Sequence, residues 1–198
     1  MKNIITISRE FGSGGRTVGH KVAEALGIPF YDKEIVSQVA GETGFHESFV
    51  ELEGEYASST NRFAFALSSQ PTHNSLGGMS INDFLWVTQR KVILDIASKG
   101  PCVIVGRCAD YILRDRDDVL NVFIYSDMQS RADRIVRLYG ESEKSPEKRL
   151  EEKDKKRKVY YKHFTGNDWG VCKNYHVALN SGVIGIDKCV EIITDIAR

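Results

Sequence analysis

The sequence opens with a short apolar run, a glycine-rich turn and an amphipathic helix in direct succession. Residues 4–8 are mainly β-branched and apolar, which is typical of a strand buried on both faces. Residues 12–15 contain three glycines, and the segment from 15 to about 26 places Val18, Val22 and Leu26 on one helical face before Gly27. A strand that passes through a glycine turn into a helix is a building unit of parallel α/β sheets. The chain is therefore expected to fold around such a sheet.

The rest of the chain continues this alternation. Apolar segments at 102–105, 119–125 and 177–180 predict buried strands, and 28–32 predicts a short extended segment. Helical patterns separate them, at 33 to about 55 with interruptions near Gly41 and Gly44, and at 81–98, 127–139, 145–164 and 186–197. Residues 57–79 are rich in Ser, Asn and Gly, which predicts long loops with a helical turn at 62–67. Strands alternating with helices indicate a parallel sheet covered on both faces.

The glycine-rich turn has the chemistry of a phosphate-binding loop. Glycine lets consecutive backbone N–H groups point inward, and the N-terminus of the following helix adds partial positive charge. Arg16 supplies a full cation, and the Thr17 hydroxyl stands where such loops place a ligand of Mg²⁺. The residues expected to hold the phosphates of a nucleoside triphosphate are Gly12, Ser13, Gly14, Gly15, Arg16 and Thr17.

The match to the usual loop pattern, G-x-x-x-x-G-K-[ST], is partial. Gly15, Arg16 and Thr17 take its last three places, but Glu10 stands at the first glycine and arginine replaces lysine. Arginine can still hold two phosphate oxygens at once. A second register, moved by one residue, puts Gly15 at the lysine position, and the sequence does not choose between the two.

Charge and composition narrow the class of partner. The chain has 27 basic and 27 acidic residues, a balance unlike that of proteins that coat nucleic acid. Between 131 and 162, however, 12 Lys or Arg face 7 Asp or Glu, and such a local basic zone fits a small anionic ligand. No apolar run approaches a membrane span, and the N-terminus turns polar too soon for a signal peptide. Four cysteines without a paired motif predict free thiols in a cytoplasmic protein.

Three segments carry a resemblance to a known family, namely residues 4–16, 26–33 and 103–107, and the tail 175–181 fits its last strand. Over most of its length the chain resembles the cytidylate-kinase-like branch of the P-loop nucleoside monophosphate kinases. The resemblance implies the P-loop NTPase fold, a three-layer α/β/α arrangement of a five-stranded parallel sheet with helices on both faces and a helical lid. It also implies one domain, 1–198, with a mobile acceptor-binding region at about 33–79 and a lid at about 145–170.

The functional residues of that family match this chain in part. In cytidylate kinases an arginine after the third core strand grips the acceptor phosphate, and Arg107 matches it in position. Asp154 and Arg157 match a lid acid that faces the cytidine and a lid arginine that clamps phosphate. Asp32 and Lys33 are expected near the acceptor. The family's arginine in the helix after the second strand is missing here, and Lys33 is the nearest cation.

Several of these residues also fit plainer interpretations. Arg107 also fits an ordinary surface arginine at a strand end, and Asp32 equally fits a helix cap. The basic run 153–158 is also typical of a solvated helix face. Three aromatic residues before the predicted turn at 165–167 fit either a base-stacking surface or the core: Tyr160, Tyr161 and Phe164.

The resemblance as a whole implies ATP-dependent phosphoryl transfer with Mg²⁺ to a small nucleotide, with no nucleic-acid or membrane partner. Arg16, Arg107 and Arg157 are the expected catalytic residues, because transfer between two anions needs charge neutralisation and alignment. CMP or dCMP is the first acceptor to consider. Two alternatives stay open, a kinase of another small metabolite and a nucleotide-binding sensor without turnover. The sequence indicates no oligomeric state.

Overall fold

The computed structural model describes residues 2–55 and 79–198. Apart from Met79, the predicted loop region 57–79 and its helical turn at 62–67 lie outside them. Five parallel strands form one sheet in the order β2-β3-β1-β4-β5. The strands are β1 Ile4–Arg9, β2 Phe30–Tyr31, β3 Cys102–Val105, β4 Val119–Tyr125 and β5 Val177–Asn180. The predicted parallel sheet is confirmed.

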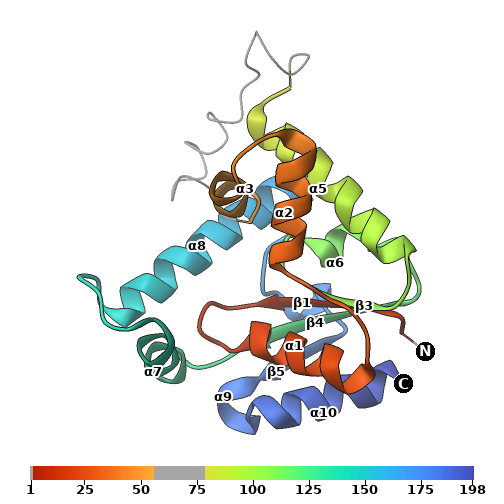
Figure 1. The fold of residues 1–198 in the computed structure, drawn as a ribbon. Coiled ribbons are helices and arrows are strands. Elements are labelled where there is room, and N and C mark those ends of the chain that lie inside the picture. The colour runs from red at the N-terminus through yellow and green to blue at the C-terminus, as the bar shows by residue number, and fades with distance from the viewer. Residues whose placement is uncertain (1, 56–78) are drawn as a thin grey trace.

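Helices cover both faces of this sheet because successive strand residues point to opposite sides. In β1, Ile4 packs into one core cluster and Ile5 into the other. The helices on the Ile5 side are α1 Gly15–Leu26 and α10 Ile186–Ala197, and those on the Ile4 side include α2 Lys33–Thr43, α3 Glu47–Glu53 and α5 Ile81–Ser98. Figure 1 shows these two layers below and above the sheet. The three-layer prediction is confirmed.

Two further helices extend the molecule on one side of the sheet (Figure 1). They are α7 Met128–Tyr139 and α8 Pro146–Thr165, and each begins with a side-chain cap, from Asp127 and Ser145 respectively. Helix α8 runs from beside α7 toward α3 and α5, passing over one edge of the sheet. Three short elements complete the description, namely α6 Ala109–Ile112, the single turn η1 Cys172–Asn174 and α9 Ser181–Ile184.

Two sequence predictions about element bounds were wrong. The second strand is limited to Phe30–Tyr31, because Pro29 has no N–H to give a neighbour and α2 already begins at Lys33. The helix predicted from 33 is not interrupted near Gly41, which lies inside α2, but the interruption predicted near Gly44 is present, because α2 ends at Thr43 and α3 begins at Glu47. Among the described residues, none of the helices combines the length and the hydropathy that crossing a membrane requires.

Candidate active site

A cleft of about 720 Å³ opens at the carboxyl ends of β1, β2 and β3. Its volume falls within the range of about 300–1,000 Å³ that small-molecule sites occupy. Eight of the described residues that line it are Lys or Arg and five are Asp or Glu. Open parallel sheets bind their ligands at this edge. The cleft therefore has the place, size and charge of a site for a small anion.

The glycine-rich loop forms one wall of this cleft. Gly12, Gly14 and Gly15 all line it, and α1 begins at Gly15, so that the N-terminus of a 12-residue helix meets the cavity. Gly14 has a φ of 81°, a left-handed conformation that favours glycine. Ser13 differs from its neighbours, because its hydroxyl donates to the carbonyls of Glu10 and Ile124 within the protein. Its backbone N–H also donates to the Glu10 carbonyl, at 3.3 Å, so both donors of Ser13 are used within the protein.

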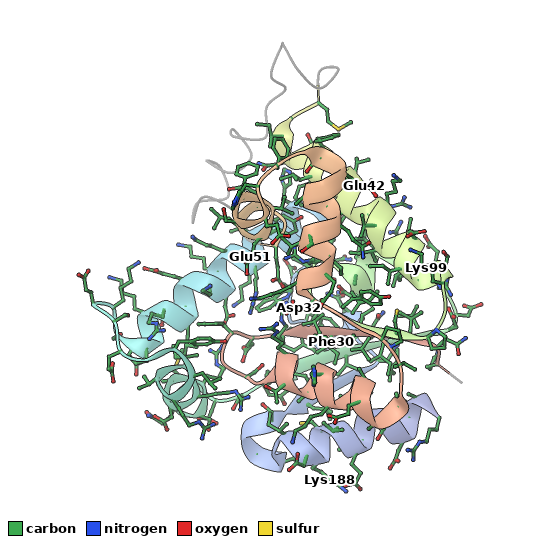
Figure 2. The ribbon with its side chains drawn as sticks, viewed as in Figure 1. Phe30, Asp32, Glu42, Glu51, Lys99 and Lys188 are labelled. Carbon is green, nitrogen blue, oxygen red and sulfur yellow. The ribbon has the colours of Figure 1, made fainter. Side chains whose placement is uncertain are left out.

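Arg16 reaches across the cleft to Asp32, with 2.6 Å between Arg16 Nε and Asp32 Oδ2. The Arg16 side chain is 54% exposed, so it is free to turn toward a ligand. Asp32 stands at the start of α2 (Figure 2), but its side chain makes no capping hydrogen bond there. Asp32 therefore occupies the N-cap position of α2 without capping the helix through its side chain. Lys33 is exposed and lines the same cleft.

A cation that the sequence analysis did not select lies over the loop. Arg134 of α7 donates from Nη2 to Thr17 Oγ1 at 2.9 Å and also lines the cleft. Burial lowers the pKa of Arg134, and nearby Arg137 adds to that shift. The Thr17 hydroxyl oxygen has a second lone pair, which leaves it able to bind a metal ion. The spacing of Arg131 and Arg134 on one helical face, just after a strand, was the signal that could have revealed them.

Arg107 is buried, with 4% of its surface exposed. It follows β3 with a φ of 57°, and its Nη1 donates to Gln89 Oε1 at 3.1 Å. Gln89 Nε2 in turn donates to the Arg107 carbonyl at 3.3 Å. Within the described part of the chain, Arg107 Nε has no hydrogen-bond partner although it is buried. The interpretation of Arg107 as a surface arginine is therefore wrong.

The predicted lid pair, Asp154 and Arg157, lies on the buried face of α8. Asp154 accepts from the Phe11 N–H at 2.8 Å and from Arg131 Nη1 at 2.5 Å. Arg157 Nη1 donates to the Arg9 carbonyl at 3.1 Å. These bonds hold α8 against the glycine-rich loop. In this structure both side chains bond to protein groups, so contact with a substrate stays a prediction.

The rest of the basic run has the character of a solvated helix face. Lys155 and Lys158 are exposed, whereas Lys153 lines the cleft with its Nζ 5.0 Å from the centre of the Phe11 ring. Further along α8, Phe164 stacks on Trp86 with 4.6 Å between ring centres. The aromatic residues at this end of α8 pack into the core rather than line the cleft.

Glu10 occupies the place of the first loop glycine and turns its carboxylate toward α7. Its Oε2 accepts from the Ser126 N–H at 3.2 Å and lies 3.5 Å from Arg131 Nη1. Burial raises the pKa of Glu10, and the neighbouring Arg131 only partly opposes that effect. The departure from the usual loop pattern thus joins the loop to α7.

The described part of the cleft also contains a buried carboxylate that the sequence analysis did not select. Glu55, just after α3, forms a two-pronged ion pair with Arg9, and its Oε1 lies 3.9 Å from Arg157 Nε. Burial by itself raises the pKa of Glu55, but Arg9, Arg157 and Arg107 outweigh it and lower the pKa to about 2. No local pattern reveals Glu55, because its partner Arg9 lies 46 residues away.

The comparisons with known proteins agree with this geometry. A family model described as the cytidylate kinase-like family matches residues 4–183. An uncharacterized protein from Eubacterium ventriosum has a similar structure, with 27% identity, a TM-score of 0.72, and 98% of this chain and 97% of that one covered. Shikimate kinases from Acinetobacter baumannii, in complex with shikimate, and from Bacteroides thetaiotaomicron share the fold at 17% and 13% identity. Both have a TM-score of 0.56 over 98% of this chain, with 92% and 97% of their own chains covered. The search of curated proteins gave no match.

Proposed function

The chain belongs to the cytidylate kinase-like family, a family of small-molecule kinases, and from that premise we propose that it transfers the γ-phosphoryl group of ATP to a nucleoside monophosphate, CMP or dCMP first. The single observation that carries the proposal is the meeting of two features in one cleft. The glycine-rich loop, at the N-terminus of α1, faces a set of arginines from β1, β3, α7 and α8. Such a cleft suits two phosphate groups that must be brought together.

The loop side is assigned to the donor. The backbone of Gly12–Gly15 and the N-terminus of α1 bind the β- and γ-phosphates, and Arg16 leaves Asp32 to hold the γ-phosphate. The Thr17 hydroxyl, which lines the cleft and keeps a free lone pair, fits a bound Mg²⁺. When bound, Mg²⁺ neutralises phosphate charge during transfer.

The arginine side is assigned to the acceptor. Arg107 grips the acceptor phosphate from the end of β3, Arg157 stabilises the charge that develops between donor and acceptor, and Asp154 and Lys33 lie toward the rest of the acceptor. No general base is required, because a phosphate oxygen is already ionised at neutral pH. We also propose that residues 145–170 act as a lid and that 33–79 bind the acceptor. A closed lid excludes water and so prevents hydrolysis of ATP.

A second candidate, a kinase of a small hydroxyl-bearing metabolite, is supported by Asp32. Its carboxylate lies in the cleft, does not cap α2, and can accept a proton from an acceptor hydroxyl. The chain shares its fold with shikimate kinases, so this chemistry is compatible with the architecture. Sequence identities of 17% and 13% support a shared fold only.

ADP release from ATP and Mg²⁺ tests both candidates, with CMP, dCMP, UMP, AMP, GMP and shikimate offered in turn. We expect release that depends on CMP or dCMP. No release with any monophosphate, together with measurable ATP binding, would discard the leading proposal and favour another acceptor or a sensor without turnover. Asp32→Asn separates the two kinase candidates, because loss of a general base costs about 10²–10⁴-fold in kcat with a hydroxyl acceptor. With a phosphate acceptor, the loss should be within about tenfold, since only the Arg16 contact is removed.

A further inference from the structure

Glu55 is surrounded by three arginines on the acceptor side of the cleft. Arg9 holds both of its carboxylate oxygens, and Arg157 approaches one of them. The positive charge of Arg107 also lowers the pKa of Glu55. A Cβ added at Gly54 would lie 2.7 Å from Arg107 Nη1, which places the Arg107 guanidinium beside the end of α3. All four side chains are buried. The three arginines therefore form an enclosed binding site for an anion, with Glu55 inside it.

The backbone of β3 forms the floor of this site. The Arg9–Glu55 ion pair lies directly over Gly106, where an added Cβ would collide with both partners. Gly106 has a φ of 74° and directly precedes Arg107, the residue assigned to the acceptor phosphate. The Glu55 carboxylate thus occupies the position at the end of β3 that the proposed reaction requires for the acceptor phosphate.

Charge within the site is unbalanced. Among the described residues, three guanidinium groups meet the Glu55 carboxylate, and Arg157 Nη1 also lies 3.6 Å from Asp154 Oδ1. In the same part of the chain, Arg107 Nε has no hydrogen-bond partner. A phosphomonoester brings about two negative charges and three acceptor oxygens, so it can satisfy more of these donors than a carboxylate can. A buried site with an excess of donors favours the ligand that uses them.

We propose that Glu55 is an internal competitor for the acceptor-phosphate site and lowers its affinity for incoming anions. This inference rests on the proposed function, because it takes the arginine site as the place of the acceptor phosphate. An incoming anion binds by displacing the Glu55 carboxylate from Arg9, Arg107 and Arg157. A second carboxylate gains little from that exchange, whereas a phosphomonoester gains charge and hydrogen bonds. The three arginines therefore select phosphate over carboxylate, and Glu55 lowers the apparent affinity for both in the same proportion.

The test measures the binding of inorganic phosphate and of acetate to the full chain by calorimetry, without ATP or acceptor. In Glu55→Gln the competing charge is lost while the shape is kept. We expect the phosphate Kd to fall by about tenfold or more. In the parent chain, Glu55 occupies the site, and the apparent Kd rises as the fraction of molecules with a free site falls. Acetate should gain by about the same factor as phosphate, so the ratio of the two Kd values should stay unchanged within about twofold. Weaker or unchanged phosphate binding in Glu55→Gln would overturn the proposal.

Glu51→Gln is the matched control. Glu51 (Figure 2) is an exposed glutamate of α3 that lines the same cleft, and its loss should change the phosphate Kd by less than about twofold. If Glu55→Gln does not fold alone, Glu55→Asp keeps the charge on a shorter side chain, and it should bind phosphate more tightly than the parent chain. Phosphate binding is measured without turnover, so the two proposals can fail separately. The Glu55 proposal can fail while CMP is still phosphorylated, and it can hold while none of the tested acceptors is phosphorylated.

Discussion

Arginines line both sides of the cleft, but they differ in solvent exposure and in their partners. On the loop side, Arg16 is mostly exposed and has one ion pair, to Asp32. On the opposite side, Arg9, Arg107 and Arg157 are at most 9% exposed and are held by protein groups. One side presents cations to solvent, and the other encloses them.

This difference indicates what each cation is tied to. An exposed arginine can leave one partner for a ligand at little cost, because a surface ion pair contributes about 0–1 kcal/mol. A buried arginine depends on its anion, and removing either partner leaves an uncompensated charge. Substitutions on the loop side should therefore change activity alone, whereas substitutions among the enclosed charges should change the free energy of unfolding as well.

The largest effect is expected from Arg131→Met, which breaks the buried pair with Asp154. We expect the free energy of unfolding to fall by about 3–5 kcal/mol, because buried Asp154 loses its nearest cation and keeps, among the described residues, only Arg157 as an ion-pair partner at 3.6 Å. Glu10 loses Arg131 as well. Urea unfolding measures the change. Arg137→Met removes an exposed arginine of the same helix and should stay within about 0.5 kcal/mol. Equal, small changes in both variants would show that the enclosed charges do not stabilise the fold.

Arg16→Ala should reveal the opposite behaviour. We expect kcat to fall by about 100- to 1,000-fold, the usual cost of removing one group that stabilises transition-state charge. The melting temperature should fall by no more than about 4 °C, because the Arg16 side chain is 54% exposed, although that of Asp32 is only 13% exposed. Arg16→Lys keeps a cation and should retain more of the activity. Unchanged turnover in Arg16→Ala would remove Arg16 from the mechanism.

Local sequence patterns were enough to predict the fold and the loop side. The run at residues 4–8, the glycines of the loop and the caps at Ser80 and Ser145 are local signals, and each element they predict is present. Arg16 and Thr17 were found in the same way, because they belong to one continuous motif. For such residues, position in the sequence largely fixes position in the cleft.

The enclosed side was harder to predict because its partners are far apart in the sequence. Asp154 was selected through a resemblance, but its bond to Arg131 joins two helices, and Glu55 reaches Arg9 across 46 residues. Neither ion pair is visible as a local sequence pattern, since only the packing of distant segments brings the two charges together. Arg107 was predicted as a functional residue, but its support by Gln89 depends on how α5 packs beside β3.

A third prediction uses the buried carboxyl group of Asp110, which accepts a hydrogen bond from Tyr161. Burial raises the pKa of Asp110 to about 6, although a hydrogen bond from Tyr161 opposes the shift. The folded protein thus binds the proton more tightly than the unfolded chain, for which the pKa is 3.8. The stability from this group is present below about pH 4 and is lost as the pH rises through 6, by about 3 kcal/mol at about 1.4 kcal/mol per unit of pKa.

Urea unfolding of Asp110→Asn across pH 4 to 7.5 measures this contribution. The variant should gain about 3 kcal/mol relative to the parent chain over that interval, because asparagine carries no charge at either pH. Asp115→Asn, whose side chain is 84% exposed, is the control and should follow the parent chain. Parallel curves for Asp110→Asn and the parent would show that folding does not raise the pKa of Asp110, and that burial does not favour its protonated form here.

The smallest expected effect concerns Arg134, which stands between the two sides of the comparison. Arg134 is half-buried, so it is less exposed than Arg16 but more exposed than the enclosed cations. Its partner is the neutral Thr17 hydroxyl rather than an anion. Because no buried charge is left behind, Arg134→Met should keep the free energy of unfolding within about 1 kcal/mol. It should raise the KM for ATP by about tenfold through loss of one phosphate contact, whereas Arg137→Met should leave that KM unchanged. If Arg134→Met lost more stability than ATP binding, Arg134 would belong with the enclosed charges. The solvent exposure of an arginine would then indicate less well than the chemistry of its partner which arginines bind the ligand.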